Sequence, residues 1–158
     1  MTLLTDYLLV ALSLQFSVWL WRLARQYRQT SLQFWTSSFL FTAVAAAMGG
    51  TFHMFTLFLA DSTLPALWNT IVYCIGIGSS FVLSGAFAPS RQRESTSLRW
   101  LLSGVAVSIV GHGIQQSGIV LHRHLNHNDL YHIIQMVTLF LFYRGVRLLR
   151  AEPFGTEH

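Results

Sequence analysis

The 158-residue chain has few charged residues, a single cysteine and no lysine. Charged residues make up 10% of the sequence, whereas a typical soluble domain has about 25%. So few charges would not cover the surface of a soluble protein of this size, and Cys74 alone cannot form an intramolecular disulfide. The composition therefore argues against a soluble enzyme, a disordered chain and a disulfide-stapled domain. The length predicts one domain over residues 1–158.

All ten basic residues are arginine, and the formal net charge is +4. An excess of positive charge can indicate a nucleic-acid partner. Here, however, the arginines lie at the ends of apolar segments and do not form one basic face. That distribution is typical of membrane proteins, so we expect no nucleic-acid partner.

Five apolar segments cover most of the chain, at residues 3–23, 32–59, 64–88, 100–121 and 130–149. About 20 apolar residues cross a hydrocarbon core of ~30 Å as a helix. The sequence therefore predicts an all-α fold, a polytopic integral membrane bundle of five transmembrane helices. The last segment spans only if Arg144 and Arg147 extend their side chains to the headgroups. A four-span arrangement with this segment lying flat stays open.

The arginines also orient the predicted bundle. With five spans, nine of the ten arginines fall on one side of the membrane and only Arg123 falls on the other. The positive-inside rule makes the arginine-rich side cytoplasmic, so the N-terminus is outside and the C-terminus inside. We expect the protein in a bacterial inner membrane, with membrane lipids as partners.

Pairs of small residues four positions apart recur in the middle segments, as in Gly76 with Ser80 and Gly104 with Ser108. Such pairs let two helix backbones approach closely. Packing within the bundle explains them most simply. A homo-oligomer or a partner subunit in a membrane complex is the alternative.

Polar side chains gather toward the outer end of the predicted bundle. On this topology His53, His112 and His132 lie in the outer half, and Gln115 and Gln116 follow His112 on the same helix face. Ionisable groups inside a membrane indicate a functional site, because burying them in lipid is costly. The alternative is a structural role, as hydrogen bonds between helices.

The next helix begins close to three further polar residues, and each could act as its cap: Asn126, Asn128 and Asp129. A carboxylate at that position could instead orient a histidine or act as a base. Both roles stay open for Asp129.

Two short stretches carry a family resemblance: Gly49-Gly50-Thr51-Phe52-His53 and His127-Asn128-Asp129-Leu130-Tyr131-His132. They remotely resemble the CREST superfamily of transmembrane hydrolases, which includes alkaline ceramidases, adiponectin receptors and hemolysin III, or a related bacterial membrane family. That superfamily has a seven-helix core in which three histidines bind zinc, and a metal-bound water attacks an amide or similar bond. In this chain Gly49 stands at the family's serine, Asn69 at its aspartate and Asn128 at the first histidine of its last motif.

The resemblance implies a zinc site with His53, His127 and His132 as ligands and Asp129 or Asn69 as the supporting catalytic group. His112, Gln115 and Gln116 would then line the pocket that receives the bound group. His127 and His132 are five residues apart, and five residues turn a helix by about 500°. They can share a metal only if His127 precedes the helix, with Asn128 or Asp129 as the cap.

Three functions therefore stay open. The first is a zinc-dependent hydrolase of lipid or amide substrates. The second is an electron-transfer subunit, because histidines on facing helices of a bundle can bind haem, and such a site could also take a quinone. The third is a non-enzymatic membrane subunit or sensor.

Overall fold

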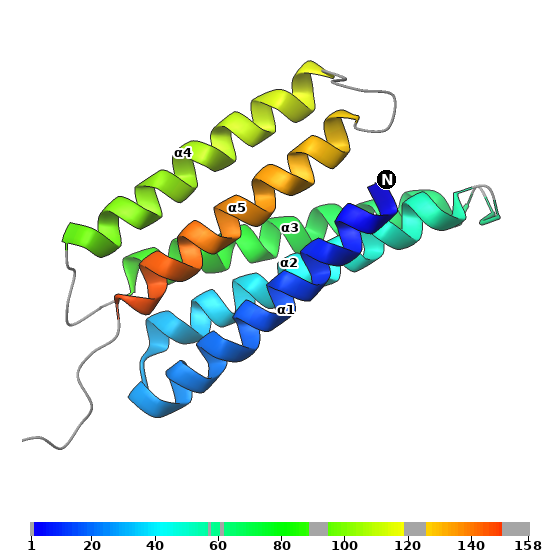
Figure 1. The fold of residues 1–158 in the computed structure, drawn as a ribbon. Helices are drawn as coiled ribbons and strands as arrows, with labels where there is room; N and C mark the ends of the chain where they lie inside the picture. The colour runs from blue at the N-terminus through cyan, green and yellow to red at the C-terminus, as the bar shows by residue number, and fades with distance from the viewer. Residues whose placement is uncertain (1, 57, 61, 89–94, 119–125, 150–158) are drawn as a thin grey trace, which may run out of the picture.

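The structure is a computed structural model that describes every residue except 1, 57, 61, 89–94, 119–125 and 150–158. Its elements are five helices: α1 (Thr2–Tyr27), α2 (Thr30–Phe55), α3 (Thr63–Phe87), α4 (Ser95–Ser117) and α5 (His127–Arg147) (Figure 1). The described part of the chain contains no strand, so the all-α prediction is confirmed. Four of the helices, α1 to α4, are long and apolar enough to cross a membrane.

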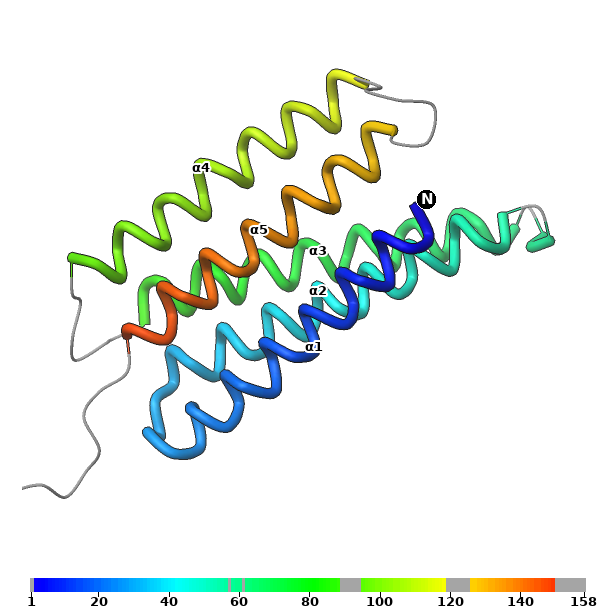
Figure 2. The backbone as a smooth tube through the Cα atoms, in the orientation of Figure 1, coloured from blue at the N-terminus to red at the C-terminus, as the bar shows by residue number. Residues whose placement is uncertain are grey.

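Successive helices run in opposite directions, so α1, α3 and α5 are parallel to one another (Figures 1 and 2). Helix α2 packs between α1 and α3, and α5 packs between α1 and α4. Along the described residues, α3 and α4 do not contact each other. The bundle is therefore a curved row in the order α3, α2, α1, α5, α4.

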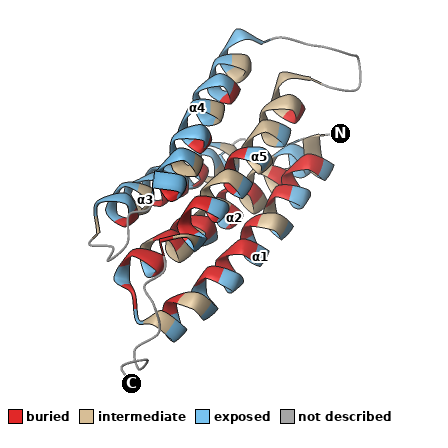
Figure 3. Ribbon diagram, turned by 60° about the vertical axis from the view of Figure 1, so that its left-hand side comes forward, coloured by how far each residue is buried: buried red, intermediate tan, exposed pale blue. Residues whose placement is uncertain are grey.

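The core lies where α1, α2 and α5 meet. Phe16 stacks on Tyr143 with ring centroids 4.6 Å apart and meets Phe39 edge-on at 5.8 Å. Leu20 and Val146 are fully buried beside these rings. Figure 3 shows that α1, α2 and α5 contain most of the buried residues, whereas α3 and α4 are largely exposed. The apolar outer surfaces of α3 and α4 suit contact with lipid.

Serine hydroxyls join neighbouring helices at the end of the bundle where α1 finishes. Ser31 in α2 donates a hydrogen bond of 2.8 Å to the carbonyl of Gly85 in α3. Ser97 in α4 donates one of 2.9 Å to the carbonyl of Gly145 in α5. Both glycines allow close approach: a Cβ on Gly85 would lie only 2.7 Å from Nε1 of Trp35. These buried hydroxyls are therefore satisfied by the packing that the glycines permit.

The described arginines lie at that same end of the bundle, where α1 and α5 finish and α4 begins: Arg22, Arg25, Arg28, Arg99, Arg144 and Arg147. Arg25 lies over the ring of Trp21 at 4.9 Å, and Arg144 lies over the ring of Trp100 at 5.3 Å. The arginine asymmetry predicted from the sequence is therefore present among these residues. The other arginines lie outside the described residues, Arg123 among them.

Two expectations about the helices need correction. Helices α4 and α5 begin earlier than the apolar segments 100–121 and 130–149, because polar first turns are helical too.

The predicted small-residue contacts divide into two kinds. A Cβ on Gly104 would lie 2.6 Å from the ring of Phe142, so this position packs α4 on α5. A Cβ on Gly76 would meet no atom within 4 Å, so the Gly76 face packs against no described helix.

Candidate functional site

Helix α5 starts with a capping box. The side chain of Asn126 accepts a hydrogen bond of 3.0 Å from the backbone N–H of Asp129. In return, Oδ2 of Asp129 accepts one of 3.2 Å from the backbone N–H of Asn126. The exchange satisfies free N–H groups of the first turn and fixes the Asp129 carboxylate, which is 1% exposed. Of the three capping candidates, Asn126 is therefore the cap, and His127 is the first residue of the helix.

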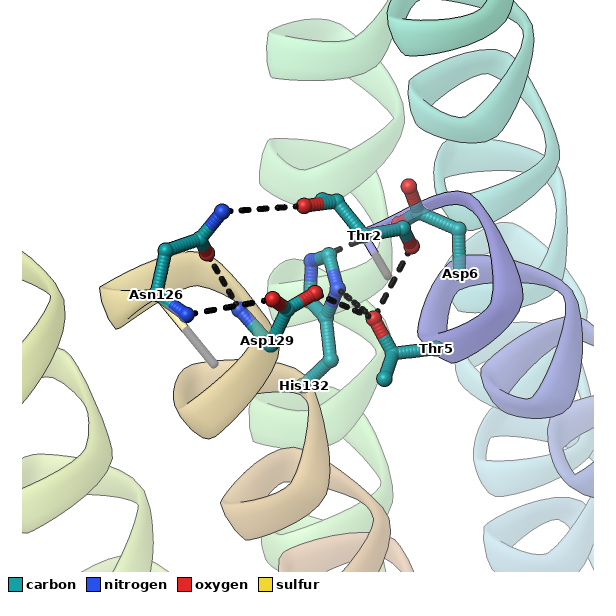
Figure 4. Close-up of polar contacts among 6 residues, drawn as sticks. All are labelled: Thr2, Thr5, Asp6, Asn126, Asp129 and His132. Carbon is teal, nitrogen blue, oxygen red and sulfur yellow. Dashed lines mark hydrogen bonds and ion pairs between the residues drawn. The ribbon is translucent and has the colours of Figure 1, made fainter. Parts of the chain in front are cut away.

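A chain of polar contacts joins the starts of α1 and α5 (Figure 4). Oγ1 of Thr5 lies 3.3 Å from Oδ1 of Asp129 and 3.1 Å from Nδ1 of His132. The other ring nitrogen of His132, Nε2, lies 3.4 Å from Oδ1 of Asp6. The Thr5 hydroxyl has one proton, which it donates to Asp129 or to the carbonyl of Thr2. In the tautomer that carries a proton on Nδ1 of His132, the Thr5 oxygen accepts a hydrogen bond from that N–H, and the contact orients the ring.

Sequence reasoning missed Thr5 and Asp6. Asp6 is the only acidic residue in the predicted segment 3–23. An ionisable residue inside an apolar span is a signal for a functional site, and this signal could have placed Asp6 with the histidines. Thr5 gave no such signal, because its role depends on the contact between α1 and α5.

A cavity of about 630 Å³ opens beside this chain of contacts. Helices α2, α3, α4 and α5 supply most of its walls, and α1 contributes Asp6 and Leu9. Apolar and aromatic side chains line much of its length, including Phe39, Ile71 and Phe142. Its polar residues are concentrated where α1 and α5 begin. A cavity of this size and character is typical of ligand pockets.

The cavity brings together six of the residues predicted for the site: His53, His112, Gln115, Gln116, His127 and His132. His53 is also near enough to Asp129 and His132 to interact with both electrostatically. The two predicted catalytic residues lie elsewhere. Asn69 is exposed on α3, and Asp129 is buried in the capping box; neither belongs to the described cavity wall.

Several buried polar atoms of cavity-lining residues have no hydrogen-bond partner in the described part of the chain. They are Oδ2 of Asp6, Nδ1 of His127, Oγ1 of Thr138 and Nε1 of Trp35. A buried polar atom without a partner costs about 1–3 kcal/mol. Such atoms favour a water molecule or a polar ligand group in contact with them.

The residues as arranged do not fit the expected zinc site. Both ring nitrogens of His132 already have contacts, with Thr5 and with Asp6. His127 lies inside the helix, so the condition under which His127 and His132 could share a metal is not met. Across the described residues, no group of three or more His, Cys, Asp or Glu side chains is placed to hold a metal ion. Zinc stays a prediction, and no catalytic step is derived through it.

Comparisons with known proteins give one family. No curated protein matches the chain, and no solved structure matches it either. The resemblance to the CREST superfamily therefore stays an expectation. The model of a family of unknown function, DUF6962, matches residues 1–94 and 89–151, which together cover most of the sequence. The chain therefore belongs to DUF6962.

Proposed function

We propose that this protein is an integral membrane protein that binds an amphipathic, lipid-like ligand in the cavity between α2, α3, α4 and α5. One observation carries the proposal: apolar side chains line much of the cavity's length, whereas Asp6, His127 and His132 line the end where α1 and α5 begin. At that end Oδ2 of Asp6 and Nδ1 of His127 are buried and have no hydrogen-bond partner in the described part of the chain. A ligand with an apolar chain and a polar head matches this division. Its head would lie near Asp6, His53 and His132.

The arrangement of the helices supports entry from the bilayer. The cavity is lined by residues of both α3 and α4, and these two helices do not contact each other along their described lengths. A ligand passing between them would break no helix–helix contact. Entry from water is not required for a molecule with an apolar chain.

The membrane topology belongs to the same proposal. We place α5 across the membrane beside α1, giving five spans with the N-terminus outside. The two helices are tied at both ends, since Asn126 donates to Thr2 at one end and Gln29 donates to the carbonyl of Leu149 at the other. The arginine-rich end then faces the cytoplasm of a bacterial cell.

Hydrolysis of an amide or ester bond in the bound molecule is a second candidate function. It is favoured by the orientation of His132, whose ring lies between Thr5 and Asp6. His132 can accept a proton as a general base only after one ring nitrogen leaves these contacts. Bound zinc would supply a Lewis acid, but His132 would first have to release one of its contacts. Zinc analysis of the wild type and of the His53→Ala, His132→Ala double variant tests this candidate. Full occupancy in the double variant would exclude these ligands.

Binding of dodecyl compounds tests the main proposal. The protein in lipid nanodiscs is incubated with radiolabelled dodecanol, dodecylamine or dodecanoate, and bound label is counted. Ser108→Phe places a bulky ring in the cavity wall, whereas Ile109→Phe changes a neighbouring residue of α4 that is 68% exposed and outside the described wall. We expect the wild type and Ile109→Phe to bind at least one compound and Ser108→Phe to lose that binding. Failure of all three compounds to bind the wild type, or equal binding by both variants, would refute the proposal. An absorbance spectrum of the same sample tests the alternative of a haem-binding electron-transfer subunit, because bound haem gives a Soret band.

A further inference from the structure

We propose that the head of the bound amphiphile is a positively charged amine that pairs with Asp6. This inference rests on the proposed function, since it names the chemical class of the ligand in the same cavity. It follows from the surroundings of one carboxylate, from the balance of charge at this end of the bundle and from the aromatic rings nearby.

The Asp6 carboxylate is buried, and only one of its two oxygens has a polar contact among the described residues. Asp6 is 2% exposed and lines the cavity. Oδ1 has the contact with His132, whereas Oδ2 is buried and has no hydrogen-bond partner. The carboxylate also rests on two glycines of α2: a Cβ on Gly50 would lie 3.2 Å from Cβ of Asp6, and one on Gly49 would lie 3.6 Å from Oδ1. The two glycines therefore let α2 pack closely against the side chain of Asp6.

The balance of charge favours a cation. Two carboxylates, Asp6 and Asp129, are buried where α1 and α5 begin. Oδ2 of Asp129 accepts a hydrogen bond from the backbone N–H of Asn126, Oδ1 lies 3.3 Å from the Thr5 hydroxyl, and the N-terminus of α5 stabilises the charge of Asp129. Among the described residues, the basic group in contact with Asp6 is the imidazole of His132, which carries a positive charge only when it is protonated. The chain has no lysine, and its described arginines lie at the other end of the bundle.

A buried carboxylate is costly unless it is paired with a cation or fully hydrogen-bonded. An ammonium head would supply both a charge and N–H donors to Oδ2. A carboxylate or phosphate head would instead be repelled by Asp6. An alcohol would supply a donor without the charge.

Aromatic rings at the same end of the cavity also suit an ammonium group. Phe52 and Trp68 both line the cavity, with ring centroids 5.9 Å apart. A cation near the face of such a ring is attracted by its quadrupole. Neither ring offers a comparable attraction to an anionic head.

The three dodecyl compounds that test the proposed function also test this inference, because they share one chain and differ in the head. We expect the wild type to bind dodecylamine about ten- to hundredfold more tightly than dodecanol, as a hydrogen bond between charged groups would give. Dodecanoate should bind more weakly than dodecanol. Asp6→Asn keeps the shape of the side chain and should remove the preference for the amine while binding of dodecanol persists. Asp61→Asn, in the sequence between α2 and α3 and outside the described residues, is the control for the loss of one negative charge and should keep the preference.

The outcomes separate the two proposals. If no compound binds the wild type, the proposed function fails. If dodecanol or dodecanoate binds the wild type as tightly as dodecylamine, the cavity is a ligand site but the inference about the amine is wrong. The wild-type result alone decides this point, whether or not Asp6→Asn folds. An undiminished preference for the amine in a folded Asp6→Asn variant would also overturn it.

Discussion

Oδ1 of Asp6 in the first helix lies 3.4 Å from Nε2 of His132 in the last helix. The pair forms because α1 and α5 run parallel and begin at the same end of the bundle (Figure 1). Both side chains are largely buried, with 3% and 12% of their surfaces exposed. The contact therefore joins the first helix to the last, and both of its residues line the cavity.

Removing one partner of this pair should destabilise the fold. Truncating one member leaves a buried polar atom of the other without its partner, which typically costs about 1–3 kcal/mol and more where the group is charged. We expect Asp6→Ala and His132→Ala each to lower the free energy of unfolding in detergent, and the double variant to lose less than the sum of both. The control is a second double-mutant cycle that combines Asp6→Ala with His112→Ala. The losses in this cycle should add, because α1 and α4 do not contact each other along the described residues. Losses that simply add for Asp6 and His132 would contradict the contact.

Two glycines of the same helix should respond in opposite ways to alanine. A Cβ on Gly85 would collide with Trp35 at 2.7 Å, whereas one on Gly76 would meet no atom within 4 Å. Gly85→Ala should therefore cost about 1–3 kcal/mol through overpacking. Gly76→Ala should be neutral or stabilise the helix by up to about 1 kcal/mol. Thermal unfolding of the two variants in detergent measures the difference, and equal destabilisation would contradict the packing of α3 on α2.

Local patterns predicted the helices and the arginine-rich end, because length, hydropathy and charge are read along a single segment. The capping box of α5 was also readable, since Asn126 and Asp129 have the spacing that such a cap requires. The sequence could not show that Thr5 and Asp6 meet His132. That contact depends on which helices are neighbours, and hydropathy does not show that α1 packs beside α5 in the bundle. For the same reason Asn69, assigned by resemblance, lies outside the described cavity wall.

Reporter fusions test the proposed topology. A fusion after Arg28 should read cytoplasmic, and one after Asp61 should read external, since the arginine-rich end is retained inside. A fusion after His158 separates the two arrangements left open by the sequence. Five spans place it in the cytoplasm, whereas four spans, with the last apolar segment lying flat, leave it outside. An external reading at Arg28 would reverse the orientation and place the polar end of the cavity at the cytoplasmic face.

The Thr5 hydroxyl should matter more than other threonine hydroxyls in the bundle. Thr5→Val keeps the side-chain shape but leaves Oδ1 of Asp129 and Nδ1 of His132 without their shared partner. Leaving buried polar groups unsatisfied costs about 1–3 kcal/mol. Thr36→Val is the matched control, because its part-buried hydroxyl donates only to the carbonyl of Leu32, one turn back in its own helix. That carbonyl already accepts a backbone hydrogen bond in a helix, so its loss should cost much less.

We expect the midpoint of thermal unfolding in detergent to fall further for Thr5→Val than for Thr36→Val. Thr5→Ser, which restores the hydroxyl, should recover most of the loss. If Thr5→Val and Thr36→Val unfold at the same temperature, the hydroxyl of Thr5 does not join α1 to α5. His132 would then lack the contact that sets its ring orientation, and the case for His132 as an oriented base would fall with it.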